Sequence, residues 1–161
     1  MPDLIVTVKE SITLPNGNSV KTTNAKTISN VNQITQRVDT ISTTFSGSGV
    51  EVFKFVDSES EQIAGSFVKD DVKYIRITNL DDTNSITLYI LQTDQESVLF
   101  DLEAGKTMMF GNATFNASST GDYADESYVD ETYYSSFTNF DTIKAKAITD
   151  DISIECLVAS A

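Results

Sequence analysis

Histidine and tryptophan are absent from the 161-residue sequence, and Cys156 is its only cysteine. Histidine is the commonest general base and a frequent metal ligand, so a serine or cysteine nucleophile would lack its usual activating partner. A lone cysteine forms no intramolecular disulfide. Cys156 stands among Ile and Val in an alternating stretch, where we expect a small buried apolar side chain. The sequence therefore predicts no enzyme, no catalytic residue and no cofactor.

Other absences exclude further classes of protein. No stretch approaches 18 consecutive apolar residues, and the N-terminus lacks the basic and apolar segments of a secretory signal. The formal net charge of −13 would repel a nucleic acid or an anionic membrane. Gly47-Ser48-Gly49 lacks the lysine and the spacing of a phosphate-binding loop. We therefore expect neither a nucleic acid nor a membrane as a partner.

Alternation of apolar and polar residues dominates what the sequence does contain. Val72–Leu80 and Ser85–Leu91 both alternate, and the tetrad Asp81-Asp82-Thr83-Asn84 between them suits a turn. We predict a β-hairpin here, with Asp81-Asp82 as turn residues. Every second residue is apolar in Val98–Leu102 and again in Met108–Phe110, which predicts a second hairpin.

Further strands are expected along the rest of the chain. Pro15-Asn16-Gly17-Asn18 is a strong turn signal and closes an N-terminal hairpin. The apolar residues Ile34, Val38, Ile41 and Phe45 have helical spacing, but the β-branched residues of Gln36–Thr44 favour a strand. The remaining expected strands are Leu4–Val8, Ser11–Leu14, Ser19–Thr22, Ala25–Ile28, Val50–Val56, Ile63–Val68, Thr142–Ile148 and Ile152–Val158.

These short strands and frequent turns predict an all-β protein. We expect residues 1–161 to form a single antiparallel β-sandwich, either jelly-roll-like or Ig-like. Residues 1–30 are either part of the sandwich or an N-terminal hairpin arm exchanged with a neighbouring subunit. Residues 111–139 read as one long irregular loop, acidic and rich in tyrosine, and long loops in compact domains are usually functional or ordered by a partner.

The acidic residues of that loop are weak candidates for a cation site. Carboxylates are the ligands that calcium prefers, but the spacing of an EF-hand and its central glycine are missing. A solvated acidic loop is the alternative interpretation. The candidates are Asp122, Asp125, Glu126, Asp130 and Glu131.

Aromatic residues are candidates for an interface between subunits. Tyrosine offers a large amphipathic contact area and is enriched at interface hot spots. The alternative is that Phe137 and Phe140 tuck under the loop as a small satellite core. Val50–Val56 is apolar on both faces, which predicts burial on two sides, within the fold or against another subunit. The interface candidates are Tyr123, Tyr128, Tyr133, Tyr134, Phe53 and Phe55.

Three segments resemble a known family. Val72–Leu88, Phe100–Lys106 and the ending from Ile143 are similar to small β-rich virion structural proteins of tailed bacteriophages, especially marine ones such as cyanophages. The likeness covers roughly residues 63–110 and 140–161, and it transfers no catalytic residue because these motifs carry no known chemistry.

The resemblance implies a capsid-associated decoration or cement protein, assembled in the host cytoplasm and located in the virion. Its implied partners are further copies of the chain, as a trimer or higher oligomer, and other virion proteins such as the major capsid protein. A tail, neck or fibre component is the alternative within the virion. A calcium- or carbohydrate-binding β-sandwich module is the alternative of another class.

Overall fold

The computed structural model describes residues 2–44, 49–92, 97–111 and 140–161. This part of the chain is all-β, as predicted, and contains no α-helix. Short 3₁₀ turns cover Glu59–Glu61 and Lys69–Asp71. The strands are β1 (Leu4–Thr13), β2 (Ser19–Ile28), β3 (Gln33–Ile41), β4 (Val50–Val56), β5 (Ser66–Val68), β6 (Val72–Asn79), β7 (Ile86–Gln92), β8 (Ser97–Leu102), β9 (Thr107–Gly111), β10 (Phe140–Ala147) and β11 (Ile152–Ser160).

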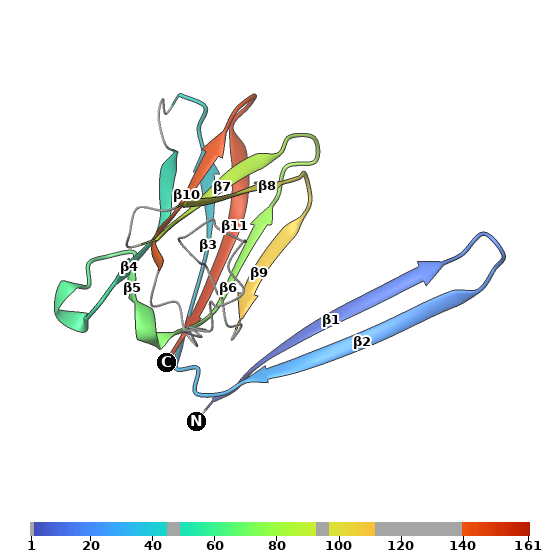
Figure 1. Cartoon of the computed structure of the whole chain (residues 1–161), viewed down its shortest axis with the longest axis horizontal. Helices are drawn as coiled ribbons and strands as arrows, with labels where there is room; N and C mark the ends of the chain where they lie inside the picture. The colour runs from blue at the N-terminus through green and yellow to red at the C-terminus, as the bar shows by residue number, and fades with distance from the viewer. Residues whose placement is uncertain (1, 45–48, 93–96, 112–139) are drawn as a thin grey trace, which may run out of the picture.

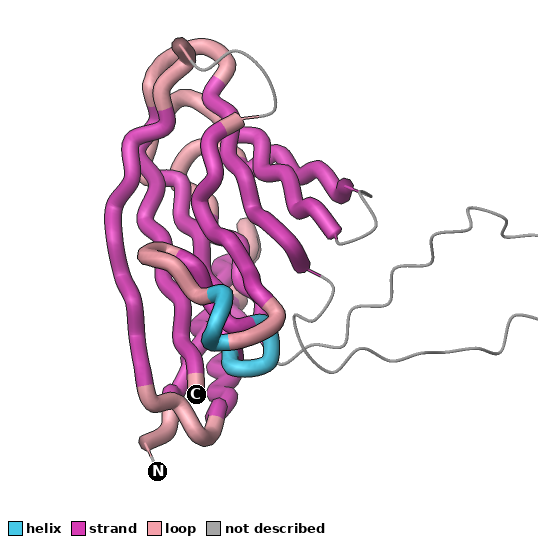
Figure 2. Tube along the Cα trace, turned by 90° about the vertical axis from the view of Figure 1, so that its left-hand side faces the viewer, coloured by secondary structure: helices cyan, strands magenta, loops and turns pink. Residues whose placement is uncertain are grey.

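Two sheets form the body of the protein (Figure 1). One sheet has the order β3-β11-β6-β9 and is antiparallel throughout. The other has the order β5-β4-β10-β7-β8 and is antiparallel except for the short parallel pair of β4 with β5. The strands of the four-stranded sheet run along the length of the body (Figure 1), and several turns gather at its two ends (Figure 2).

One hydrophobic core contains side chains from both sheets. Burying a large aliphatic or aromatic side chain stabilises a fold by about 1.5–3 kcal/mol, so this core can hold the body together by itself. Core members include Phe53, Phe55, Ile75, Ile77, Leu88, Ile143, Ile154, Cys156 and Val158.

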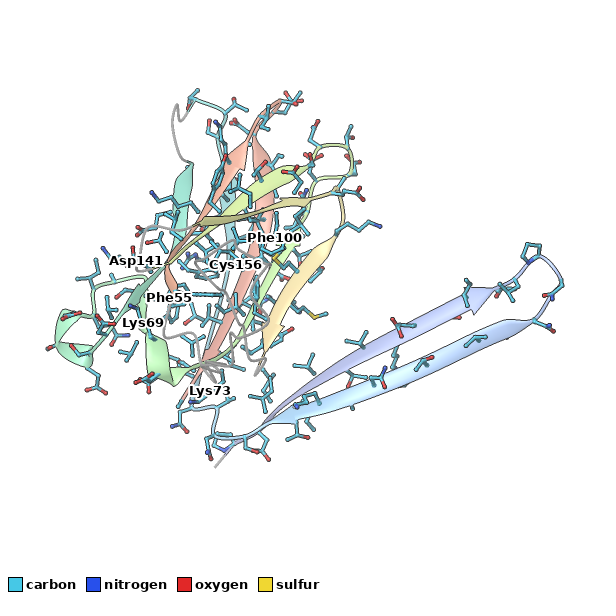
Figure 3. The ribbon with its side chains drawn as sticks, viewed as in Figure 1. Phe55, Lys69, Lys73, Phe100, Asp141 and Cys156 are labelled. Atoms are coloured by element: carbon cyan, nitrogen blue, oxygen red, sulfur yellow. The ribbon has the colours of Figure 1, made fainter. Side chains whose placement is uncertain are left out.

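The central strand β11 shows why the sequence forms this core. Ile152, Ile154, Cys156 and Val158 are all buried, whereas the side chains between them are only partly covered. Strand side chains alternate between faces, so one face of β11 is apolar and packs inward. The predicted strand is confirmed, and so is the expectation that Cys156 is a buried apolar side chain (Figure 3).

Both hairpins predicted in the body are wrong, although their strands exist. β6 lies in the four-stranded sheet and β7 lies in the five-stranded sheet, and β9 and β8 are divided in the same way. Each connection therefore crosses from one sheet to the other. The alternation of apolar and polar residues shows which side chains face the core, but it does not show which strands pair. Two strands in opposite sheets have the same alternation as two strands of a hairpin.

Asn79 organises the connection from β6 to β7. Its side chain is fully buried, and Nδ2 donates to the carbonyl oxygens of Asn84 at 2.8 Å and Leu102 at 3.0 Å. Its Oδ1 accepts from the backbone N–H of Asp81 at 3.0 Å. The Asp81 carboxylate in turn accepts from the N–H groups of Asn84 and Thr83, which lowers its pKa below the ordinary value. The predicted turn role of Asp81 is confirmed.

Gln33–Ile41 is a strand, so the choice of strand over helix for this region is confirmed with shifted bounds. At the N-terminus, the separate short strands expected at residues 4–14 and 19–28 are in fact β1 and β2, ten residues each. They pair with each other and close at the predicted turn, where Leu14 N–H donates to the Asn18 carbonyl at 2.7 Å. Gly17 has a φ of +84° in this turn, a conformation that favours glycine.

Burial gives Cys156 a testable pH dependence. Desolvation, followed by the charge of Asp39, raises the pKa of its thiol from 9.0 to about 12. The unfolded chain ionises this thiol first, so its contribution to stability is full below about pH 9 and is lost as the pH rises toward 12. Relative to Cys156→Ala, the wild type is expected to lose about 1.4 kcal/mol of unfolding free energy by about pH 10. Urea titrations across this range measure the difference, and parallel profiles for the two proteins would contradict it.

Candidate functional site: the exposed hairpin arm

β1 and β2 form a hairpin that projects away from the body (Figure 1). We call residues 4–28 the arm. Its register runs from Leu4 opposite Ile28 to Thr13 opposite Ser19. Ten residues of strand span about 33 Å. A two-stranded hairpin is marginally stable by itself in water, so an arm of this length is a candidate for contact with another molecule.

The two faces of the arm differ in chemistry. One face carries mainly hydroxyl groups, with Lys9, Lys21, Ala25 and Ile5, whereas the other carries six apolar side chains together with Glu10, Thr22, Asn24 and Lys26. We call this second face the apolar face; its apolar side chains are Leu4, Val6, Val8, Ile12, Val20 and Ile28, with Leu14 following in the turn. Ile12 and Val20 lie opposite each other on the apolar face, and each is 56% exposed. Both lie next to the turn that closes the arm, and this end of the arm projects away from the body (Figure 3).

The base of the arm is seated on the outer face of the four-stranded sheet. Ile28 is buried against Tyr74 and Ala159, and Leu4 and Val6 pack on the same cluster. Gly111 leaves room for this contact, because a Cβ there would lie 2.8 Å from the Tyr74 ring. Burial raises the pKa of the Tyr74 hydroxyl, partly offset by Arg76. The apolar face is therefore packed at its base and open toward its tip.

Charge also separates the arm from the body. Residues 4–28 contain three lysines and one glutamate, a net charge of +2, whereas residues 29–161 contain eight basic and 22 acidic residues, a net charge of −14. Opposite charges on two surfaces steer their association and suppress wrong partners. The arm combines an apolar face with the sign of charge that an acidic surface attracts.

The aromatic pair predicted as interface residues belongs to the core. Phe53 is 1% exposed and Phe55 is 2% exposed. The Phe53 ring packs edge to face against Phe67, with 5.9 Å between the ring centres, and the Phe55 ring packs in the same way against Phe140, with 6.0 Å between the ring centres. A partner cannot reach either ring, so the alternative of burial within the fold is the observed one. This corrects the assignment of Phe53 and Phe55 to an interface.

The remaining predicted site residues lie outside the described residues. They are the acidic candidates Asp122, Asp125, Glu126, Asp130 and Glu131, and the aromatic candidates Tyr123, Tyr128, Tyr133 and Tyr134. Phe140, which the alternative interpretation placed beneath that loop, is buried in the core of the body.

A hollow of about 360 Å³ lies beside the edge strand β3 and is bordered by β4. Arg37 lines it and is already engaged, because its Nε donates to the Asp39 carboxylate at 2.7 Å and its Nη2 donates to the Val52 carbonyl oxygen. Its guanidinium also lies 5.1 Å from the centre of the Phe53 ring. These contacts fix the arginine as part of the wall between the sheets, so its guanidinium is already occupied.

Sequence reasoning located the arm as a hairpin but did not single out the residues on its apolar face. The available signal was the period of two that continues from Leu4 through Val6 and Val8 to Ile12 and Leu14, interrupted by Glu10. The expected division into the strands Leu4–Val8 and Ser11–Leu14 did not show that most of their apolar residues share one face of a single strand. A single ten-residue strand would have placed Ile12 and Val20 side by side.

Within residues 2–44, 49–92, 97–111 and 140–161, no group of three or more His, Cys, Asp or Glu side chains could hold a metal ion. The same part of the chain has no helix that is both long and apolar enough to cross a membrane. Comparisons with protein-family models, with curated proteins and with solved structures found no match.

Proposed function

We propose that this chain is a virion structural protein of a tailed bacteriophage, most simply a capsid-associated decoration or cement protein that acts as a homo-oligomer. The observation that carries the proposal is the arm, whose apolar face is exposed although the body has a complete core of its own. Burying this exposed apolar face against another chain would stabilise an assembly, whereas the fold of the body does not need it. The chain transforms no molecule and needs no cofactor.

The strand order supports this proposal. Without the arm and β5, eight strands remain, ordered β3-β11-β6-β9 and β4-β10-β7-β8. This is the order of a jelly-roll sandwich, a fold that recurs in viral capsid proteins and in lectins. Because one fold hosts many functions, the strand order is only compatible with a capsid protein, and the exposed arm is what supports an assembly role.

The segments that resemble phage proteins also meet in space. Asn79 binds the Leu102 carbonyl through its side chain, and its backbone N–H donates to the Lys106 carbonyl at 2.9 Å. Gly105 N–H donates to the Asp81 carbonyl at 2.9 Å. The first two resembling segments therefore form one hydrogen-bonded end of the body. Their shared residues build turns, which supports a structural role.

The alternative of another class, a calcium- or carbohydrate-binding module, is favoured by no described residue. It is tested directly by thermal unfolding with millimolar calcium or with glycans. A ligand that binds the folded state raises the melting temperature by mass action. We expect no shift with either ligand, and a clear shift would favour the module.

Mass spectrometry of purified phage particles tests the virion assignment. A decoration protein contributes many weak contacts that add up over the shell, so we expect hundreds of copies per particle. A dozen copies or fewer would move the protein to the tail, neck or fibre. Absence from the particles would contradict the proposal.

A further inference from the structure

The outer face of the four-stranded sheet has exposed apolar side chains beyond the base of the arm. Ile34 and Val38 on β3 and Met109 on β9 are all exposed, and Leu157 on β11 lies between them, partly covered. A sheet of four strands is about 14 Å across, which is wide enough to hold a two-stranded hairpin face to face.

The charged side chains at the centre of this face are paired with each other. Arg76 Nη2 donates to Glu155 Oε2 at 2.6 Å, and Gln36 Nε2 donates to Glu155 Oε1 at 2.6 Å. An arm landing here would cover a charged pair of the sheet and not a lone charge, which reduces the cost of covering polar groups. The face therefore combines open apolar side chains with a paired Arg76 and Glu155, of which only Arg76 Nε is buried without a hydrogen-bond partner among the described residues.

We propose that the arm of one copy lies with its apolar face across the outer face of the β3-β11-β6-β9 sheet of a neighbouring copy. The inference rests on the homo-oligomeric part of the proposed function and specifies its contact. The base of the arm already packs on this sheet through Leu4, Val6 and Ile28, so the same face of the arm fits the same kind of surface.

Charge selects this contact over pairing between two arms. In total charge, two arms would bring +2 against +2, whereas an arm near a neighbouring body brings +2 toward −14. This attraction acts at long range, because Lys9 and Lys21 lie on the face opposite the apolar face, and on the apolar face itself the charges of Lys26 and Glu10 cancel. Like charges across an interface are unfavourable and opposite charges speed association. The body of a second copy is therefore the preferred surface for the arm.

A second exposed apolar strip, on β8, is the competing landing site. Val98, Leu99 and Phe100 are exposed there. They lie on a single edge strand, however, and point to both of its faces. A hairpin packing face to face contacts several strands of one sheet, which the outer face of the four-stranded sheet offers and the β8 strip does not.

The contact has different surfaces on its two sides, so each copy gives one arm and receives one. Contacts of this kind close into rings when the rotation between copies allows it. Two copies could also exchange arms reciprocally, and the trimer or higher oligomer of the proposed function corresponds to the ring.

Matched glutamate substitutions test the role of the apolar face. Ile12→Glu lies on that face and Ile5→Glu lies on the opposite one, at 56% and 65% exposure, so both add the same charge to an exposed site of the arm. We expect Ile12→Glu to weaken assembly at least tenfold and Ile5→Glu to change it less than threefold, by sedimentation equilibrium. Equal effects of the two variants would overturn the inference. The melting temperature of the dissociated subunit, expected to stay the same, controls for misfolding.

Cross-linking between copies tests where the arm lands. A copy with Ile12→Cys is mixed with a copy carrying Val38→Cys, and a short flexible bismaleimide is added. We expect a cross-linked pair in this mixture, and none from Ile12→Cys alone or from its mixture with Leu99→Cys on β8. A product from Ile12→Cys alone would show pairing between arms, and a product with Leu99→Cys would show docking on β8. Either product overturns the inference.

The outcomes separate this inference from the proposed function. An oligomer that cross-links through another surface contradicts the landing site but leaves an assembly protein. A chain that stays monomeric and is missing from phage particles contradicts both. Wild-type protein treated with the bismaleimide is the control for Cys156, which is buried and is expected not to react.

Discussion

Replacing Gly49 with alanine is expected to destabilise the subunit by about 3–5 kcal/mol, because overpacking and backbone strain act at one site. The new Cβ would lie 2.6 Å from the carbonyl oxygen of Ala145 and 3.0 Å from its carbonyl carbon. Both atoms belong to the backbone of β10, which is held between β4 and β7 and cannot move aside. Gly49 also has a φ of +87°, which strains any residue with a Cβ. Urea unfolding measures the loss.

Gly65→Ala is the matched control. Gly65 has a φ of +86°, almost the same as Gly49, but a Cβ there meets nothing within 4 Å. Only the backbone strain remains, and it costs about 1–2 kcal/mol. The difference between the two variants therefore isolates the close approach of residue 49 to β10. If the two glycines prove equally tolerant of alanine, the packing of β4 on β10 described above is wrong.

Asn79→Asp is expected to be similarly severe at neutral pH, with a loss of about 3–5 kcal/mol. The substitution keeps the shape of the side chain but replaces the donor that binds the carbonyl oxygens of Asn84 and Leu102 with a carboxylate. A buried carboxylate facing two carbonyl oxygens has a raised pKa, so the variant is most stable when it is protonated. The deficit should shrink as the pH falls from 7 toward 4.

Asn18→Asp controls for the change of charge. Asn18 is exposed in the turn of the arm, and exposed substitutions of this kind usually change stability by less than about 0.5 kcal/mol. Unfolding of both variants and the wild type at pH 7 and pH 4 gives the comparison. A deficit for Asn79→Asp that does not depend on pH would contradict the assigned role of the buried amide.

The strands were predictable because each one carries its own pattern. β11 alternates through Ile152, Ile154, Cys156 and Val158, and every one of these side chains is buried. The pairing of the strands was not predictable, because it depends on contacts between distant segments. Asn79 illustrates this: its side chain bonds Leu102, 23 residues away, at the point where the chain crosses between sheets instead of forming a hairpin.

The candidate site was predictable only in part, for a related reason. The turn at Gly17 and the apolar residues of the arm are visible in the sequence, but their exposure is not. Phe53 and Phe55 have a similar apolar character and are buried, whereas Ile12 and Val20 are open. Hydrophobicity alone does not separate a core from a docking face, because both bury apolar surface in the end.

Sedimentation velocity of the full-length chain, over a wide range of concentration and at low and high salt, tests the central claim most directly. We predict one species of three or more copies at physiological salt, and weaker association at high salt because the arm and the body have opposite charge. A chain that stays monomeric at every concentration and salt would contradict an assembly protein.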